Sequence, residues 1–129
     1  MSLLRIFITI VLVFTVPAAW SRVIHVAQES SGLTKDGSTW QTAYSDLQVA
    51  LSGAVAGDEI WVAEGTYRPS TTDPAISFDL RPGVAVYGGF RGTESSRDER
   101  GPGDLTILDG AEFTWHVVNA DDTVGRDRW

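Results

Sequence analysis

Short runs of β-branched and aromatic residues recur along this chain, and each run closes on glycine or on Asp-Gly. The first run spans residues 57–67, the second spans residues 83–90 about twenty-four residues further on, and a weaker third spans residues 105–110. Repetition with a period of roughly 20–50 residues indicates a solenoid, in which stacked repeats bury one continuous core. The repeat therefore predicts the architecture of the chain and says little about its chemistry.

The amino terminus has the pattern of a secretory signal peptide over residues 1–21. Arg5 supplies the positive n-region, residues 6–16 are apolar apart from two threonines, and small residues precede the expected cleavage site. Such a segment is too short to span a bilayer, which needs about 20 apolar residues. We predict cleavage before Arg22 and a secreted or cell-surface bacterial protein; an uncleaved anchor or a buried strand is the alternative.

Charge and cysteine content exclude several classes of function. The net charge is −7, from ten basic and seventeen acidic residues, and Lys35 is the single lysine. A negative field repels nucleic acid and anionic lipid, so we expect neither as a partner and no membrane insertion after signal cleavage. The chain has no cysteine, which excludes disulfides and thiolate chemistry. We also expect no cofactor, and a length suited to one small domain.

The first part of the mature chain reads as a strand, a loop and a helix. Residues 23–26 are a short strand candidate, residues 27–39 contain turn chemistry, and residues 46–53 are predicted to be helical. Ser45 and Gln48 fit a capping box with Ser45 as the N-cap. Apolar residues at helical spacing share one side of this helix: Tyr44, Leu47, Leu51 and Ala54.

From residue 58 onward the apolar period changes to two, which is typical of strands. Ile60 and Val62 then share one face, and Trp61 and Ala63 the other. Stacking of the repeats would form two interior ladders, one of Ile60, Val84 and Leu105 and one of Val62, Val86 and Ile107. Further strand candidates are residues 76–80 and 116–119, and four prolines fall between the strands: Pro69, Pro74, Pro82 and Pro102.

Short strands with glycine turns and no long helix favour parallel coils that wind around a core. The alternative is an antiparallel sandwich built from hairpins. No Asn-Gly or Gly-Gly pair stands as a two-residue turn between matched strands, and such turns are the usual mark of hairpins. We therefore favour the parallel arrangement.

Several sequence blocks also resemble a known group of proteins. Residues 36–40, 43–51 and 57–67, continued by residues 86–94 and 106–110, resemble the N-terminal part of secreted bacterial right-handed parallel β-helix proteins. These belong to the pectin-lyase-like superfamily, and the resemblance covers nearly the whole mature chain. The superfamily includes polysaccharide lyases, hydrolases, esterases, adhesins and proteins without a known role, so the resemblance implies a fold and no particular activity.

The resemblance implies a mainly β, right-handed parallel β-helix with four regions. They are a signal peptide (1–21), an N-terminal cap of strand, loop and helix (22–57), about two coils (58–120) and a polar tail (121–129). In such proteins the N-terminal helix covers the open end of the first coil and protects its unpaired edge. Family members run for many coils, so we expect this chain to be truncated, with the C-terminal coils of its own fold missing.

Candidate catalytic groups are few. His25 and His116 are the two imidazoles, and each reads as a packed or surface histidine of a strand. Asp58 and Glu59 point to opposite faces of a strand, whereas paired acid and base catalysis needs two carboxyls flanking one bond; Asp58 is expected to cap its turn. Asp121 and Asp122 supply too few oxygen atoms for a calcium site, which needs six to eight oxygen ligands. We predict no catalytic, cofactor-binding or metal-binding residue.

The remaining polar and aromatic motifs have structural interpretations. Residues 88–92 are glycine-rich but lack the ending of a phosphate loop, so these glycines are expected to form a corner between strands. Trp61 is expected beneath the helix, although it and three other aromatic residues could stack on sugar rings: Tyr67, Tyr87 and Phe90. A loop of mixed charge is expected to be solvated: Arg91, Glu94, Arg97, Asp98, Glu99 and Arg100.

The expected function is that of a secreted or cell-surface structural or binding module, with polysaccharide or a cell-surface protein as its partner. The alternative is the N-terminal fragment of an extracellular polysaccharide lyase or glycoside hydrolase whose active site lies in the missing coils.

Overall fold

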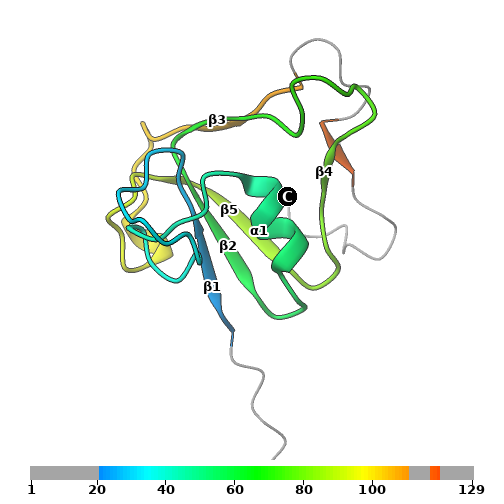
Figure 1. The fold of residues 1–129 in the computed structure, drawn as a ribbon. Coiled ribbons are helices and arrows are strands. Elements are labelled where there is room, and N and C mark those ends of the chain that lie inside the picture. Colours follow the sequence, from blue (N-terminus) through cyan, green and yellow to red (C-terminus); the bar gives the residue numbers. More distant parts are fainter. Residues whose placement is uncertain (1–20, 111–116, 120–129) are drawn as a thin grey trace, which may run out of the picture.

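The computed structural model of the chain describes residues 21–110 and 117–119. Most of the predicted signal peptide, His116 and the predicted tail at 121–129 therefore lie outside the described residues. The elements, in chain order, are β1 (Val23–Val26), α1 (Leu47–Gly53), β2 (Glu59–Ala63), β3 (Gly65–Tyr67), β4 (Phe78–Asp79), β5 (Ala85–Phe90), the 3₁₀ helix η1 (Arg97–Glu99), β6 (Thr106–Leu108) and β7 (Val118–Asn119). The fold is mainly β with one short α-helix (Figure 1).

The described strands form three small sheets in which every pair is parallel. The first has the order β1-β2-β5, the second pairs β3 with β6, and the third pairs β4 with β7. Each strand of the consecutive set β2, β3 and β4 therefore pairs with the corresponding strand of the set β5, β6 and β7. The parallel expectation is confirmed, and the alternative of an antiparallel hairpin sandwich is wrong.

The register of β2 against β5 differs from the predicted one by two residues. Ile60 lies opposite Val86, and opposite Ile24 on its other side. The predicted ladder of Ile60 with Val84 is therefore wrong. The turns explain the difference: the amide of Gly57 donates to the carbonyl of Gly83 (2.8 Å), so the two glycines before the strands are the equivalent positions.

The third repeat does not extend the first sheet. β6 pairs with β3, in the register Thr66 to Ile107, and the side chains of Leu105 and Ile107 are 65 % and 48 % exposed. Their predicted places in the interior ladders are therefore wrong. The alternation of small and apolar residues in this run fits a half-exposed strand as well as a buried one.

One hydrophobic core packs α1 against the three sheets, whose strands lie around the helix in Figure 1. It contains Ile60 and Val62, with Val84 and Val86 packed against it as partly buried residues. Its buried members are Ile24, Val26, Leu47, Ala50, Leu51, Ala54, Ile60, Val62, Tyr67 and Phe78. The predicted apolar side of the helix is thus confirmed, and it packs into this core.

The start of α1 differs from the predicted capping box. Asp46 is the N-cap, and its Oδ1 accepts a hydrogen bond from the amide of Gln48 (2.8 Å). The side-chain amide of Gln48 instead donates to the carbonyl of Ser77 (3.1 Å), which ties the helix to the segment before β4. Ser45 is therefore not the cap, because the aspartate one residue later has the extended backbone that an N-cap requires.

The outer edge of β1 is closed by the loop that follows it. The amide of His25 donates to the carbonyl of Gly37 (2.8 Å), the amide of Tyr44 donates to His25, and the amide of Ala27 donates to Tyr44. These bonds occupy backbone groups that would otherwise be free to pair with another chain. β5 is the strand at the opposite edge of this sheet.

Within residues 21–110 and 117–119, no helix has the length and apolar character needed to cross a membrane.

Candidate functional site

A groove of about 910 Å³ opens beside the C-terminal ends of β1, β2 and β5. Its volume is in the range of small-ligand sites. Three loops form it: the loop after β1, the corner between β2 and β3, and the loop after β5. It is lined by residues 27–31, 39–41, 63–65 and 91–95, together with Gly103 and Leu105. Loops carried by a rigid sheet are common places for binding residues.

Trp40 belongs to an aromatic cluster and lines the groove. Its indole Nε1–H donates to the carbonyl of Glu94 (2.8 Å), and its ring lies 4.6 Å from that of His25 and 5.5 Å from that of Phe90, between centroids. Trp61 stacks on Phe90 at 4.8 Å. These contacts hold the half-buried Trp40 ring in one orientation at the groove wall.

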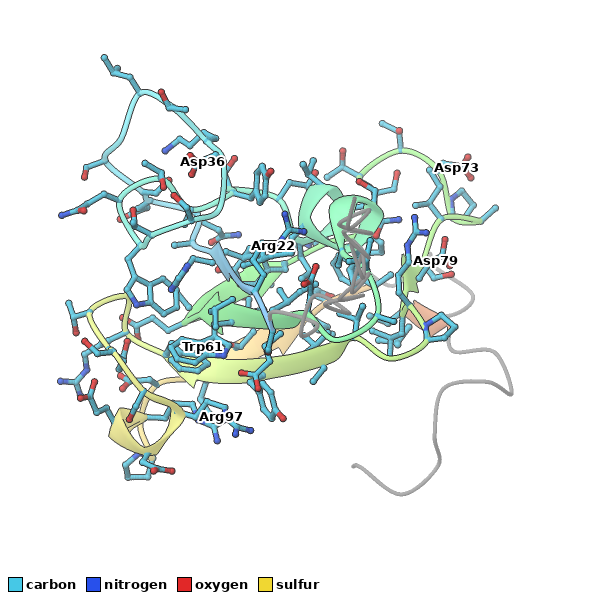
Figure 2. The ribbon with its side chains drawn as sticks, turned by 90° about the horizontal axis from the view of Figure 1, so that it is seen from below. Arg22, Asp36, Trp61, Asp73, Asp79 and Arg97 are labelled. Carbon is cyan, nitrogen blue, oxygen red and sulfur yellow. The ribbon has the colours of Figure 1, made fainter. Side chains whose placement is uncertain are left out.

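The aromatic cluster lies on the face of the first sheet that is turned away from α1, as Figure 2 shows for Trp61. The expectation that Trp61 lies beneath the helix is therefore wrong. Its neighbours Ile60 and Val62 take the helix side, because consecutive strand residues point to opposite faces. A second hydrophobic layer was not predicted, since nothing in the local pattern shows that the loop residue Trp40 returns to cover this face.

His25 is a packed strand histidine, as predicted. Its ring Nδ1 lies 3.0 Å from the carbonyl oxygen of Gly37, and its ring meets those of Trp40 and Trp61 edge to face. Its partners are thus a carbonyl and two indoles, which is a structural environment.

Glu94 lines the groove and holds the loop after β5 through hydrogen bonds to its backbone. Its side chain is 8 % exposed, and its carboxylate accepts hydrogen bonds from the amides of Arg91 (2.6 Å), Gly92 (2.9 Å) and Thr93 (3.0 Å). Burial raises the pKa of this carboxyl, but the amide hydrogen bonds outweigh burial and the pKa is lowered. The expectation of a solvated loop is wrong for Glu94, because its carboxylate accepts from the amides of the three residues before it, which form a compact anion nest.

Gln28 crosses from the loop after β1 to the corner of β2 and β3. Its Nε2 donates to the carbonyl of Thr66 (2.5 Å). Gly65 lies directly beneath it with a φ of 140°, and a Cβ atom there would lie 2.9 Å from the Oε1 of Gln28. Both the backbone and the close approach therefore require glycine at this corner.

Charged groups on the groove are mostly acidic. Glu29 and Glu64 are exposed and line it. The lining guanidinium of Arg91 is paired with Asp104, at 3.1 Å between Nε and Oδ2. The pKa of Arg91 is raised, first by the hydrogen bonds and charge of Asp104, and further by the charges of Glu64 and Glu94.

The predicted turn cap at Asp58 is confirmed. Its carboxylate is buried and accepts hydrogen bonds from the amide of Val55 (3.0 Å) and the guanidinium of Arg22 (2.9 Å). Glu59 lies on the other face, where it accepts from the Trp61 indole (2.9 Å). The two carboxyl groups therefore serve separate structural roles.

The aromatic residues considered as sugar platforms are not available for that role. Trp61, Tyr67 and Phe90 are all less than 10 % exposed, and burial raises the pKa of Tyr67 to about 12. The ring of Tyr87 is covered by Arg97 and Arg100, whose guanidinium carbons lie 4.7 Å and 5.6 Å from its centroid.

Gly88 and Gly89 of the glycine-rich run 88–92 lie within β5, where the pairing with β2 slips by one residue between Tyr87 and Phe90. The expectation that these two glycines form a corner between strands is therefore wrong. Gly89 and Gly92 have φ values of 83° and 101°. A Cβ atom on Gly88 would lie 2.7 Å from the Cβ of Thr106, whose hydroxyl contacts the carbonyls of Val62 and Ala63. This close approach brings β6 against the end of β2.

Among residues 21–110 and 117–119, no group of three or more histidine and acidic side chains could hold a metal ion. The chemistry that the groove offers is recognition: hydroxyl and amide side chains, two exposed carboxylates and one indole. The sequence singled out none of the groove residues as a site, because they come from three loops that only the tertiary fold brings together.

Comparison of the chain with family models, with curated proteins and with solved structures finds no match. The likeness to pectin-lyase-like proteins therefore rests on the sequence blocks alone.

Proposed function

We propose that this chain is a secreted or cell-surface binding module that holds carbohydrate in the groove beside Trp40. The groove itself carries the proposal. A sugar ring has an apolar C–H face and a rim of hydroxyl groups, and a site for it needs an aromatic wall and several fixed hydrogen-bonding groups. Trp40 supplies the wall, and Gln28, Thr39 and Gln41 lie among the polar groups that line the groove.

We propose further that the three parallel sheets are the cap and first coils of a right-handed parallel β-helix. The ordered pairing of β2, β3 and β4 with β5, β6 and β7 supports this, since a chain that returns to pair each strand with its equivalent makes one circuit per coil. The right hand follows from the general preference of parallel crossovers. In this arrangement α1 and the loop that closes β1 protect the first coil, and the predicted regions 22–57 and 58–120 are the cap and the coils.

Binding of defined oligosaccharides to the purified chain tests the function, measured by calorimetry and by quenching of tryptophan fluorescence. Trp40→Ala is expected to weaken binding about tenfold or more, as loss of an aromatic anchor does in other interfaces. Gln41→Ala, at an exposed side chain of the groove, should weaken binding less and leave the fold intact. Leu33→Ala is the matched control, because Leu33 is fully exposed and does not line the groove.

The proposal fails if no carbohydrate binds above background, or if Trp40→Ala, shown folded by circular dichroism, binds as the wild type does. Release of reducing or unsaturated sugar ends by the chain would support the alternative of a lyase or hydrolase.

A further inference from the structure

The distribution of charge around the groove restricts which carbohydrate it can hold. The ionisable lining residues are Glu29, Glu64, Arg91 and Glu94, and the charge of Arg91 is offset by Asp104 at 3.1 Å. The two carboxylates that face solvent, Glu29 and Glu64, stand on different loops and therefore on different parts of the wall.

A second cation, Lys35, lies beside the groove residue Ser30 and leaves the acidic groups in excess. The Nζ of Lys35 donates to the carbonyl oxygen of Ser30 (2.7 Å) and also contacts its hydroxyl. Counting Lys35, the groove and its immediate partners hold four carboxylates and two cations: Glu29, Glu64, Glu94 and Asp104 against Arg91 and Lys35. The field in the groove is negative, and the net charge of −7 on the chain adds to it.

Resting on the proposed function, we infer that the groove selects glycans whose sugar units carry free, protonated amino groups. An ammonium group bound in the groove would be attracted by the carboxylates of Glu29 and Glu64, whereas the carboxylate of a uronic acid would meet like charge. Like-charge contacts disfavour a ligand as strongly as opposite charges favour another. Polyuronides, the substrates of many pectin-lyase-like enzymes, are therefore expected to be excluded from this groove.

A matched pair of ligands isolates the charge. We would titrate the full chain with a glucosamine tetrasaccharide and with the same tetrasaccharide fully N-acetylated, at a mildly acidic pH at which the ligand amines are protonated. A tetragalacturonate serves as the anionic ligand. The free-amine ligand should bind tightest and the galacturonate weakest, and the preference should shrink as salt is raised, because exposed charges are screened.

Isosteric variants assign the preference to the groove. Glu29→Gln and Glu64→Gln should each reduce the affinity for the free-amine ligand about two- to fivefold, the range of exposed charge pairs, and leave the affinity for the acetylated ligand unchanged. Asp98→Asn is the control, since Asp98 is an exposed acid of η1 outside the groove lining and its loss changes the net charge equally.

Each outcome decides between the two proposals. Equal binding of the acetylated and free-amine ligands overturns the charge selection and leaves the carbohydrate site standing, as does tightest binding of the galacturonate. If Asp98→Asn reduces the affinity for the free-amine ligand as much as the groove variants do, the ligand is attracted by the overall negative charge of the protein. This result also overturns the charge selection by the groove. Failure of all three ligands to bind overturns the charge selection, and with it the proposed function for these sugars.

Discussion

The carboxylate of Glu94 satisfies three backbone amides of one loop, and the carbonyl of the same residue accepts the indole hydrogen of Trp40. One residue, through its carboxylate and its backbone carbonyl, therefore connects the loop after β5 to the indole at the groove wall. Removing an acceptor from buried donors costs more than the bonds themselves contributed, because the donors stay buried without a partner.

Glu94→Gln is expected to lower the free energy of unfolding by about 1–3 kcal/mol at neutral pH, since the amide can accept with one oxygen and presents an N–H to the remaining donors. Urea unfolding followed by tryptophan fluorescence measures this. Glu64→Gln, at an exposed glutamate, should change stability by less than about 0.5 kcal/mol. Equal effects of the two substitutions would contradict the role given to Glu94.

The contribution of Glu94 should also depend on pH in a defined direction. Its pKa is lowered in the folded protein from the ordinary value of 4.5, so the unfolded chain binds the proton more readily. The stabilisation is therefore fully present above that ordinary value and is lost as the pH falls through the lowered one. The stability difference between wild type and Glu94→Gln should shrink in acid, and a difference that grows there would contradict the lowered pKa.

At the scale of the element, β6 departs most from the prediction, because it pairs with β3 and not with the strands of the first sheet. Thr66 and Ile107 are partners in this pairing, and neighbouring strands lie about 4.8 Å apart. The chain has no cysteine of its own, so an engineered pair reports on the register without competing thiols.

Thr66→Cys/Ile107→Cys should form an intramolecular disulfide under mild oxidation, because partner positions fall within the Cα separation that disulfides tolerate. Loss of free thiol and a mobility shift that is reversed by reductant measure its formation. Thr66→Cys/Leu105→Cys is the matched control, since a shift of two residues along the strand places the pair about 8 Å apart. Faster crosslinking of the control would place β6 in a different register.

On the scale of the whole molecule, the strands differ in how well they are enclosed. β2 lies between β1 and β5 and contributes the fully buried Ile60 and Val62. β6 belongs to a two-stranded sheet, with the exposed Ile107 at its centre and the exposed Leu105 directly before it. Segments with few buried apolar contacts open more easily than a packed centre.

Amide hydrogen exchange should therefore be slowest in β2, intermediate in β1 and β5, and fastest in β6. A difference of about 100-fold between β2 and β6 corresponds to about 2.7 kcal/mol in local opening free energy. Exchange resolved on peptides by mass spectrometry tests this order. Protection of β6 equal to that of β2 would mean that the second sheet is enclosed as firmly as the first.

The sequence by itself determined the features that depend on local spacing. The alternation at Ile60 to Ala63 predicted a strand with its apolar face inward, and the spacing of Leu47 and Leu51 predicted the helix and its buried side. Each follows from interactions between residues close in the chain, where the period of two or 3.6 decides which side chains share a face.

Only the tertiary structure decided the register, the N-cap and the groove. Register depends on which turns meet: a shift of two residues keeps the same faces apolar, and the observed register is the one in which the Gly57 amide bonds the Gly83 carbonyl. The groove needs Trp40, Glu64 and Glu94 side by side, and no spacing in the sequence encodes that meeting. The physical reason is that parallel strands are joined by long connections. The path of that connection, and not the adjacent residues in the sequence, decides which residues become neighbours in space.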